Sequence, residues 1–159
     1  MSVYNLSNLE NLFVALRAKK QTIVFTNGCF DLLHVGHVRY LQEAKKLGDF
    51  LVVGINSDSS VKKLKGPTRP IQNENDRAEI LAALKSVDAT VIFSEETPYN
   101  LIQSLQPNVL VKGGDWAIDQ IIGADLVQAA GGQVFSLNFV DGKSTTSLIQ
   151  KANTPSEHR

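Results

Sequence analysis

The sequence has few of the features that mark disulfide-rich, metal-rich or membrane-spanning proteins. Cys29 is the only cysteine among 159 residues, which excludes an internal disulfide and a cysteine-rich zinc site and fits a reducing cytosol. No apolar run approaches the roughly 18–20 residues that a membrane-spanning helix needs. The first residues lack the basic start and long apolar run of a signal peptide. We therefore expect a cytoplasmic protein.

The chain also lacks an excess of charge of either sign. Its 16 Lys and Arg residues balance 16 Asp and Glu residues, so the formal net charge is zero. General binders of nucleic acid or of anionic membranes rely on excess positive charge, and we expect neither partner. With 43% hydrophobic and 20% charged residues, the composition is that of an ordinary globular protein.

Short apolar segments alternate with longer amphipathic ones. Runs rich in β-branched residues predict buried strands at 22–26, 50–55, 89–93, 109–112 and 133–137. Amphipathic segments predict helices at 7–18, with a capping box at Ser7, and at 35–47, 73–84 (capped by Asn73), 98–105, 118–130 and 145–151. The alternation predicts an α/β, Rossmann-like doubly wound fold, with a five-stranded parallel sheet and helices on both faces. We expect one domain over 1–151 and a flexible tail over 152–159.

Ligands of such sheets bind at the carboxyl ends of the strands. The loops to examine are therefore 27–36, 56–72, 113–117 and 139–144. In the first loop, His34 and His37 flank Gly36 at the start of a predicted helix, where free N–H groups and the helix dipole favour an anion. Two imidazoles there would stabilise charge on a phosphate. The same pair is also compatible with a metal site or with simple capping of the helix.

Residues 27–37, NGCFDLLHVGH, follow a predicted strand and resemble the signature of the HxGH nucleotidyltransferase superfamily, notably its cytidylyltransferase-like branch. The resemblance implies transfer of a nucleotidyl group to a phosphate ester with release of pyrophosphate. Residues 142–146, GKSTT, are similar to the second signature of that superfamily, although Lys143 stands where many relatives have Ile. Independently, a Ser-Thr-Thr run that opens a helix offers hydroxyl and N–H groups to an anion, or serves as an ordinary cap.

The loop over 56–72 is rich in positive charge, which suits either a phosphate clamp or a solvated surface. The family resemblance implies that a lysine from this region reaches the α-phosphate, and Lys65, with Lys62 second, is the candidate. Arg77 shares a helical face with apolar residues, so it either snorkels or meets a partner. The resemblance assigns it to the phosphate of the acceptor. Asp31 has three interpretations: it orients a histidine, binds a hydrated metal or caps the loop.

Two longer segments point to one subfamily of this superfamily. Residues 64–93 and 109–116 are similar to the adenylyltransferase domain of bacterial ADP-heptose synthesis. This implies transfer of AMP from ATP to D-glycero-D-manno-heptose 1-phosphate by direct in-line attack, with Mg²⁺ held mainly by the substrate phosphates. It also implies a separate sugar kinase and a homodimer. The alternatives are a cytidylyltransferase acting on glycerol 3-phosphate or another small phosphate ester, and a non-catalytic nucleotide sensor.

The expected site residues fall into three groups by role. The catalytic group is His34, His37 and Lys65, and the acceptor-binding group is Asp31, Lys62 and Arg77. The remaining group is expected to bind the nucleotide and consists of Thr26, Asn27, Gly28, Phe30, Gly36, Gly114, Asp115, Ser144, Thr145 and Thr146. Within it, the paired glycines after the 109–112 strand allow close backbone contact with a flat base, although a turn with a packed Trp is an alternative.

Overall fold

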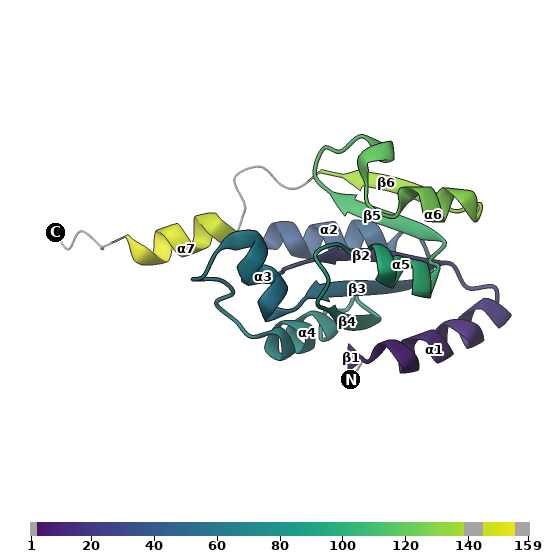
Figure 1. The fold of residues 1–159 in the computed structure, drawn as a ribbon, viewed down its shortest axis with the longest axis horizontal. Coiled ribbons are helices and arrows are strands. Elements are labelled where there is room, and N and C mark those ends of the chain that lie inside the picture. The colour runs from purple at the N-terminus through teal and green to yellow at the C-terminus, as the bar shows by residue number, and fades with distance from the viewer. Residues whose placement is uncertain (1–2, 139–144, 155–159) are drawn as a thin grey trace.

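A six-stranded parallel sheet runs through the structure, a computed structural model that describes residues 3–138 and 145–154 (Figure 1). The prediction of five strands was wrong by one, because the additional strand has only two residues and is too short to show a pattern. All neighbouring strands are parallel. Their spatial order is β1 (Val3–Tyr4), β4 (Ala89–Phe93), β3 (Phe50–Asn56), β2 (Ile23–Gly28), β5 (Val109–Gly113) and β6 (Gln133–Leu137).

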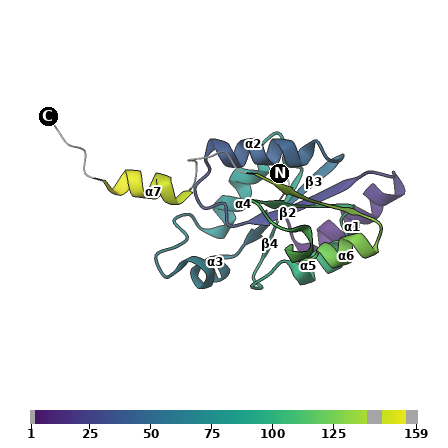
Figure 2. The same ribbon diagram turned by 90° about the horizontal axis from the view of Figure 1, so that it is seen from above.

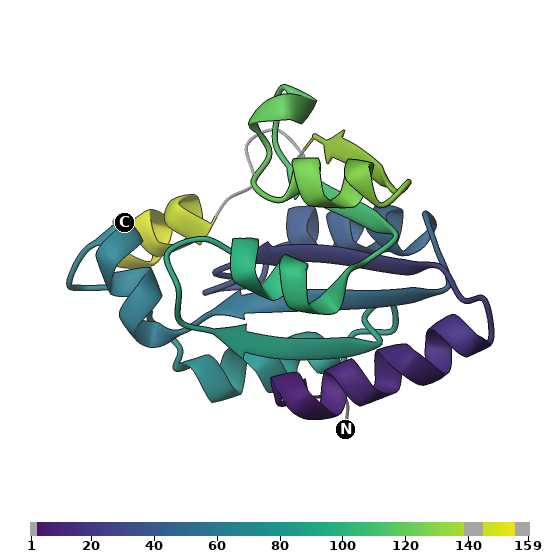
Figure 3. The ribbon, with the colours of Figure 1, turned by 45° about the vertical axis from the view of Figure 1, so that its right-hand side comes forward.

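Helices cover both faces of the sheet (Figure 2, Figure 3). Successive side chains of a strand point to opposite faces, so Phe25 of β2 packs in one layer and Val24 in the other. The α/β architecture with a parallel sheet is therefore confirmed. The first layer holds α1 (Leu6–Ala18), α5 (Tyr99–Leu105) and α6 (Ala124–Ala129), and the second holds α2 (Val35–Lys45) and α4 (Glu74–Ala82).

Asparagine side chains begin two of these helices. Asn5 Oδ1 accepts a hydrogen bond from Asn8 N at 2.8 Å, so α1 starts before the predicted capping box, and the prediction of a cap at Ser7 was wrong. Asn is as good a capping residue as Ser, and it lies one residue before the first leucine of the helix. Asn73 caps α4, as the sequence predicted, through a 3.0 Å bond from a backbone N–H three residues later.

The segment 56–72, expected to be a loop, contains a further helix, α3 (Asp58–Lys65). Ser57 Oγ accepts from Ser60 N at 3.3 Å and caps the helix, and Gly66, with φ of +102°, ends it. The sequence did not predict this helix because it has almost no apolar stripe: Val61 is buried, but Leu64 is 56% exposed. Its capping serine and terminal glycine were the available signals.

The helix predicted over 118–130 is split in two. A 3₁₀ turn, η1 (Ile118–Gln120), precedes α6, and Gly123 lies between them with φ of +87°. A Cβ at Gly123 would lie 2.6 Å from Ile102 Cδ1, so the backbone there has room for glycine alone. The apolar periodicity continues across this break, which is why the sequence predicted one helix.

The last described helix, α7 (Thr145–Asn153), points away from the sheet (Figure 1, Figure 2). It runs two residues beyond the predicted end at 151. Of the tail predicted for 152–159, residues 155–159 lie outside the described residues. Within the described ranges, no helix is long and apolar enough to cross a membrane.

The direction of the strand order changes between β2 and β5. The α2 helix that follows β2 packs on one face of the sheet, whereas α6, which follows β5, packs on the other. Val24 pairs with Val109 and Phe25 with Leu110, so the two carboxyl ends lie side by side. A switch point of this kind is where open α/β sheets bind their ligands.

Candidate functional site

The loop after β2 ends in a histidine pair that caps α2. His34 Nδ1 accepts a hydrogen bond from Gly36 N at 3.0 Å, and His34 N donates to His37 Nδ1 at 3.4 Å. The two rings stack with their centroids 3.8 Å apart. The His-x-Gly-His spacing thus builds a capping box in which each imidazole offers Nδ1 to the backbone.

This arrangement fixes the protonation state of His37. Burial, together with the neighbouring His34 and Lys65, lowers the pKa of His37 to about 4, so the ring is neutral near pH 7. Because Nδ1 accepts the bond from His34, the proton of the neutral ring lies on Nε2. His37 therefore presents an N–H donor without a positive charge.

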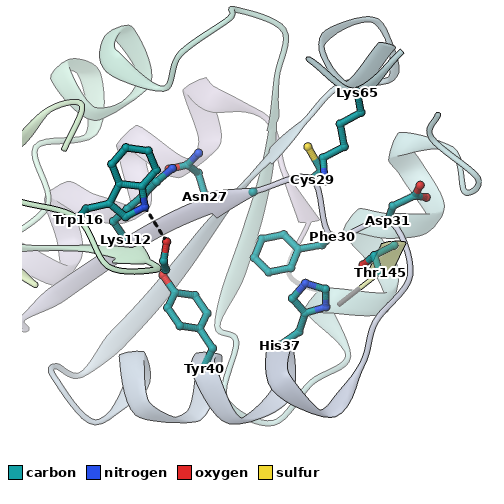
Figure 4. Close-up of a pocket in the computed structure, with 12 residues that line it drawn as sticks. Asn27, Cys29, Phe30, Asp31, His37, Tyr40, Lys65, Lys112, Trp116 and Thr145 are labelled. Carbon is teal, nitrogen blue, oxygen red and sulfur yellow. Dashed lines mark hydrogen bonds between the residues drawn. The ribbon is translucent and has the colours of Figure 1, made fainter. Parts of the chain in front are cut away.

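A pocket opens at the carboxyl ends of β2 and β5, and His37 forms part of its wall (Figure 4). Its lining comes from the β2 loop, α2, the end of α3, the end of β5 and the start of α7. Lys65 and Cys29 lie on one side of it, and Trp116 and Lys112 lie on the other (Figure 4). The lining residues are Asn27, Gly28, Cys29, Phe30, Asp31, His37, Tyr40, Lys65, Lys112, Gly113, Trp116 and Thr145.

Seven of these residues were predicted to be in the site, and the pocket brings them together from four separate segments. They are Asn27, Gly28, Phe30, Asp31, His37, Lys65 and Thr145. The other predicted residues that the structure describes do not line this pocket: His34, Thr26, Gly36, Gly114, Asp115, Thr146, Lys62 and Arg77. Ser144 lies outside the described residues.

Asp31 binds the segment that follows α3. Its carboxylate accepts hydrogen bonds from Arg69 Nε at 2.7 Å and from the backbone N–H groups of Ile71 and Gln72, both at 2.9 Å. Burial alone would raise the pKa of Asp31, but these bonds and the Arg69 charge lower the pKa below its ordinary value. Of its three interpretations from sequence, this geometry matches capping of the loop.

Arg77 is completely buried, so it does not snorkel. Its guanidinium donates to four acceptors on surrounding segments: Gln72 O, Cys29 O, Asn56 O and Asp58 Oδ1, at 2.7–3.0 Å. These bonds tie α4 to the β2 loop, to the end of β3 and to the start of α3. The structure thus gives Arg77 a bracing role and puts no part of it on the pocket wall.

Cys29 and Lys65 are neighbours at one end of the pocket (Figure 4). Burial raises the pKa of the Cys29 thiol, against the opposing effect of the Lys65 charge. The thiol therefore stays protonated near pH 7 and is a poor nucleophile. Lys62, one turn earlier on α3, is exposed and lies outside the pocket wall.

Thr145 closes the pocket from the start of α7. Its Oγ1 donates to Leu32 O at 2.8 Å, which ties α7 to the loop that carries the histidines. The residue is only 8% exposed, whereas the next one, Thr146, is exposed. Of the two described residues of the second signature, Thr145 is thus the one that the structure brings to the first signature.

Tyr40, Lys112 and Trp116 were missed as site residues. Tyr40 stands three residues after His37 on α2, so the shared helical face was the available signal. Its hydroxyl bonds Thr26 Oγ1 at 2.6 Å, and burial raises the pKa of Tyr40 to about 12. Thr26 therefore lies beneath the pocket rather than in its wall. Lys112 and Trp116 flank the glycine pair at the end of β5. From sequence, Gly114 and Asp115 were assigned to the nucleotide and a packed Trp was the alternative, so neither Lys112 nor Trp116 was predicted to be in the site.

The remaining interpretation of the histidine pair was a metal site. Among the residues that the structure describes, no group of three or more His, Cys, Asp or Glu side chains is placed to hold a metal ion. The capping histidines, of which His37 is neutral, and the neighbouring Lys65 instead suit an anionic ligand.

Known proteins resemble this chain in sequence and in fold. The bifunctional protein HldE of Syntrophotalea carbinolica is 53% identical over 144 residues, which are 91% of this chain and 29% of that protein. HldE of Geotalea uraniireducens is 55% identical over 154 residues, or 95% of this chain and 31% of that protein. The chain thus spans less than a third of the length of these relatives.

Solved structures also resemble this chain. The crystal structure of the lipopolysaccharide core biosynthesis protein from Thermoplasma volcanium has a TM-score of 0.62 and 30% identity, covering 77% of this chain and 99% of that one. A pantoate-beta-alanine ligase from Francisella tularensis, at 18% identity, shares the fold, with a TM-score of 0.62 over 98% of this chain and 74% of its own. The Cytidylyltransferase-like family matches residues 25–149. The chain, with its HxGH loop at the switch point of a parallel sheet, belongs to the cytidylyltransferase-like family.

Proposed function

We propose that this protein transfers AMP from ATP to D-glycero-D-manno-heptose 1-phosphate and releases ADP-heptose and pyrophosphate. One observation carries the proposal: a single pocket gathers His37, Lys65 and Thr145 at the switch point of the sheet. The choice of adenine and heptose is supported by 53–55% identity to the HldE proteins and by the likeness to a lipopolysaccharide core biosynthesis protein.

The chemical step is a direct displacement at phosphorus. A phosphate oxygen of the acceptor attacks the α-phosphorus of ATP, a new phosphorus–oxygen bond forms, and the bond to the bridging oxygen breaks. The electron pair of that bond leaves with pyrophosphate, and no proton has to be moved. The protein therefore has to position two anions and to stabilise the charge that develops between them.

The pocket residues fit this requirement. The Nε2–H of neutral His37 donates to a phosphate oxygen, and Lys65 supplies a full positive charge nearby. Thr145 adds the start of α7, where backbone N–H groups favour an anion. His34 acts mainly through His37, because the backbone N–H of His34 donates to the Nδ1 of that ring and so leaves the ring proton on Nε2.

We further propose that Lys65 and Arg69, rather than Arg77, bind the phosphate of the acceptor. All the bonds found for Arg77 brace buried structure. Arg69 Nη2, in contrast, is buried with no hydrogen-bond partner, and Arg69 Nε holds Asp31 in the pocket wall. A ligand oxygen that reached Nη2 would satisfy a donor that is otherwise buried without a bond.

Magnesium enters this scheme as the MgATP complex. Because the described residues include no cluster of three metal-ligating side chains, we propose that substrate phosphates hold most of the ion, which favours oxygen ligands and retains water readily. The ion supplies neutralisation of the phosphate charge.

We also propose that a separate sugar kinase makes the acceptor, that the protein acts as a homodimer, and that residues 1–151 form one domain.

Initial rates of pyrophosphate release test the proposal. ATP and CTP are each combined with heptose 1-phosphate and with glycerol 3-phosphate. We expect the highest kcat/KM for ATP with heptose 1-phosphate. A preference for CTP with glycerol 3-phosphate would establish the cytidylyltransferase alternative. Binding of ATP without pyrophosphate release for any acceptor would instead identify a nucleotide sensor.

A further inference from the structure

The turn after β5 holds an aromatic ring in the pocket wall. Trp116 is the only tryptophan in the chain, and it is 47% exposed although it lines the pocket. Its Nε1 donates to Gly113 O at 3.1 Å (Figure 4), and its backbone N–H donates to Ser136 Oγ at 3.1 Å. One bond thus holds the indole and the other holds the backbone of the residue, while much of the side-chain surface remains open.

The adjacent glycine is needed for this position. Gly114 has φ of +109°, which side chains of L-residues rarely allow. A Cβ at Gly114 would also lie 2.9 Å from Trp116 Nε1, so a larger residue would displace the ring. The position of the indole therefore depends on glycine at residue 114. A large aromatic surface held open in a pocket indicates a ligand that covers it.

Lys112 gives a second, independent indication of a ligand at this end of the pocket. It lines the pocket from the end of β5, and its Nζ lies 5.5 Å from the centroid of the Trp116 ring. Among residues 3–138 and 145–154, it forms no hydrogen bond and no ion pair. Burial lowers the pKa of Lys112. A half-buried ammonium that lies over an aromatic ring and has no hydrogen-bond acceptor within the described ranges can take its acceptors from a ligand.

We propose that Trp116 is the stacking platform for the adenine ring of ATP and that Lys112 donates a hydrogen bond to the same nucleoside. This inference deepens the proposed function and rests on it for the identity of the nucleotide. A base is flat and stacks on an indole face. Its ring nitrogens and the ribose oxygens accept hydrogen bonds, which the three N–H donors of Lys112 can provide.

The layout of the pocket supports this orientation. Trp116 and Lys112 lie across the pocket from Lys65 and Cys29, with His37 and Phe30 toward the middle (Figure 4). An ATP molecule whose base covers Trp116 can therefore extend its phosphates toward His37. The end of the pocket beside Lys65 is then left for the acceptor. The order of groups is the one that an in-line transfer between two substrates requires.

Tryptophan fluorescence tests the platform directly, because the chain has one tryptophan. ATP with Mg²⁺ is titrated into the full-length protein without acceptor, and binding is measured in parallel by calorimetry. We expect ATP to change the Trp116 emission along the calorimetric binding curve. ATP binding with no change in that emission would overturn the proposal.

Substitutions separate stacking from packing. Trp116→Leu removes the aromatic face, and we expect it to weaken ATP binding by about 5- to 150-fold, the range for loss of one base stack. Trp116→Phe keeps a ring and should recover most of the affinity. A raised acceptor KM with an unchanged ATP KM in Trp116→Leu would place the sugar on the indole and overturn the assignment.

Lys112→Met keeps the length of the side chain but removes its charge. We expect the dissociation constants of ATP and adenosine to rise by a similar factor, about 5- to 10-fold, with kcat nearly constant. The exposed Lys85→Met is the matched control and should bind ATP as the wild type does. A fall in kcat with unchanged ATP affinity would put Lys112 at the reacting phosphates and refute the nucleoside assignment.

Absence of pyrophosphate release from the wild type would refute the proposed function instead, since the fluorescence result does not depend on turnover.

Discussion

Two single residues at the start of α2, His34 and His37, serve both the fold and the proposed phosphate site. Each uses its Nδ1 to cap the helix, so the rings that we propose for the chemistry are also the capping groups. The sequence predicted the two histidines and the anion at the helix start. It did not predict that His37 is neutral, because burial and the positions of His34 and Lys65 lower its pKa, and these depend on the folded chain.

His37→Asn separates the two roles of the ring. The Asn side chain is short enough to keep an acceptor near the position of Nδ1, but it has no donor at the position of Nε2. We expect kcat to fall by about 10²- to 10³-fold, the usual effect of losing one preorganised donor, with ATP affinity and melting temperature close to wild type. His37→Ala loses the cap as well and should also melt earlier. A His37→Asn variant with wild-type kcat would remove the donor from the mechanism.

The same residue makes stability depend on pH. The His37 pKa is about 4 in the folded protein and near 6.5 when unfolded, so between these values the unfolded chain binds the extra proton. Stability contributed by this group is therefore complete above about pH 6.5 and decreases as the pH falls toward 4. Thermal melts between about pH 7 and pH 5 should show a smaller decrease in His37→Asn than in wild type. Equal decreases in both proteins would contradict the low pKa.

At the scale of elements, Arg77 joins four segments around the site. The apolar spacing of α4 predicted that Arg77 faces inward, but its acceptors come from other segments that no local pattern reveals. One of them, Asp58, begins α3, a helix that the sequence analysis missed because it has too few apolar residues for a stripe. The buried strands have continuous apolar runs, so their bounds were predicted within one or two residues. The α3 helix buries few side chains and therefore has no such pattern in its sequence.

Replacing Arg77 should therefore destabilise the fold before it affects binding. We expect Arg77→Ala to reduce the free energy of unfolding by about 3–5 kcal/mol, because it leaves buried acceptors and a carboxylate without their donor. Arg77→Lys should be intermediate, since an ammonium cannot reach all four acceptors. Urea unfolding measures both, and the exposed Arg39→Ala is the control. Wild-type stability combined with a tenfold higher acceptor KM in Arg77→Ala would instead make Arg77 a ligand of the acceptor.

At the scale of the whole molecule, the strand order brings distant segments to one pocket. The β2 loop and α2 supply His37, α3 supplies Lys65, β5 supplies Lys112 and α7 supplies Thr145. The alternation of strands and helices predicted a parallel sheet and its ligand-binding edge. The side chains that meet there follow from packing across the sheet, which explains why Lys112 and Trp116 were not recognised as partners of the first loop.

We propose that ATP and the acceptor occupy this pocket together and react directly. Trp116 and Lys112 line one end of the pocket and Lys65 lines the other, and burial raises the pKa of the Cys29 thiol, which makes it a poor nucleophile. The most direct test is isotope exchange between labelled pyrophosphate and MgATP. In the absence of acceptor we expect no label in ATP from a preparation that is fully active with ATP and heptose 1-phosphate. Label entering ATP without acceptor would demonstrate an adenylyl-enzyme intermediate and contradict direct transfer.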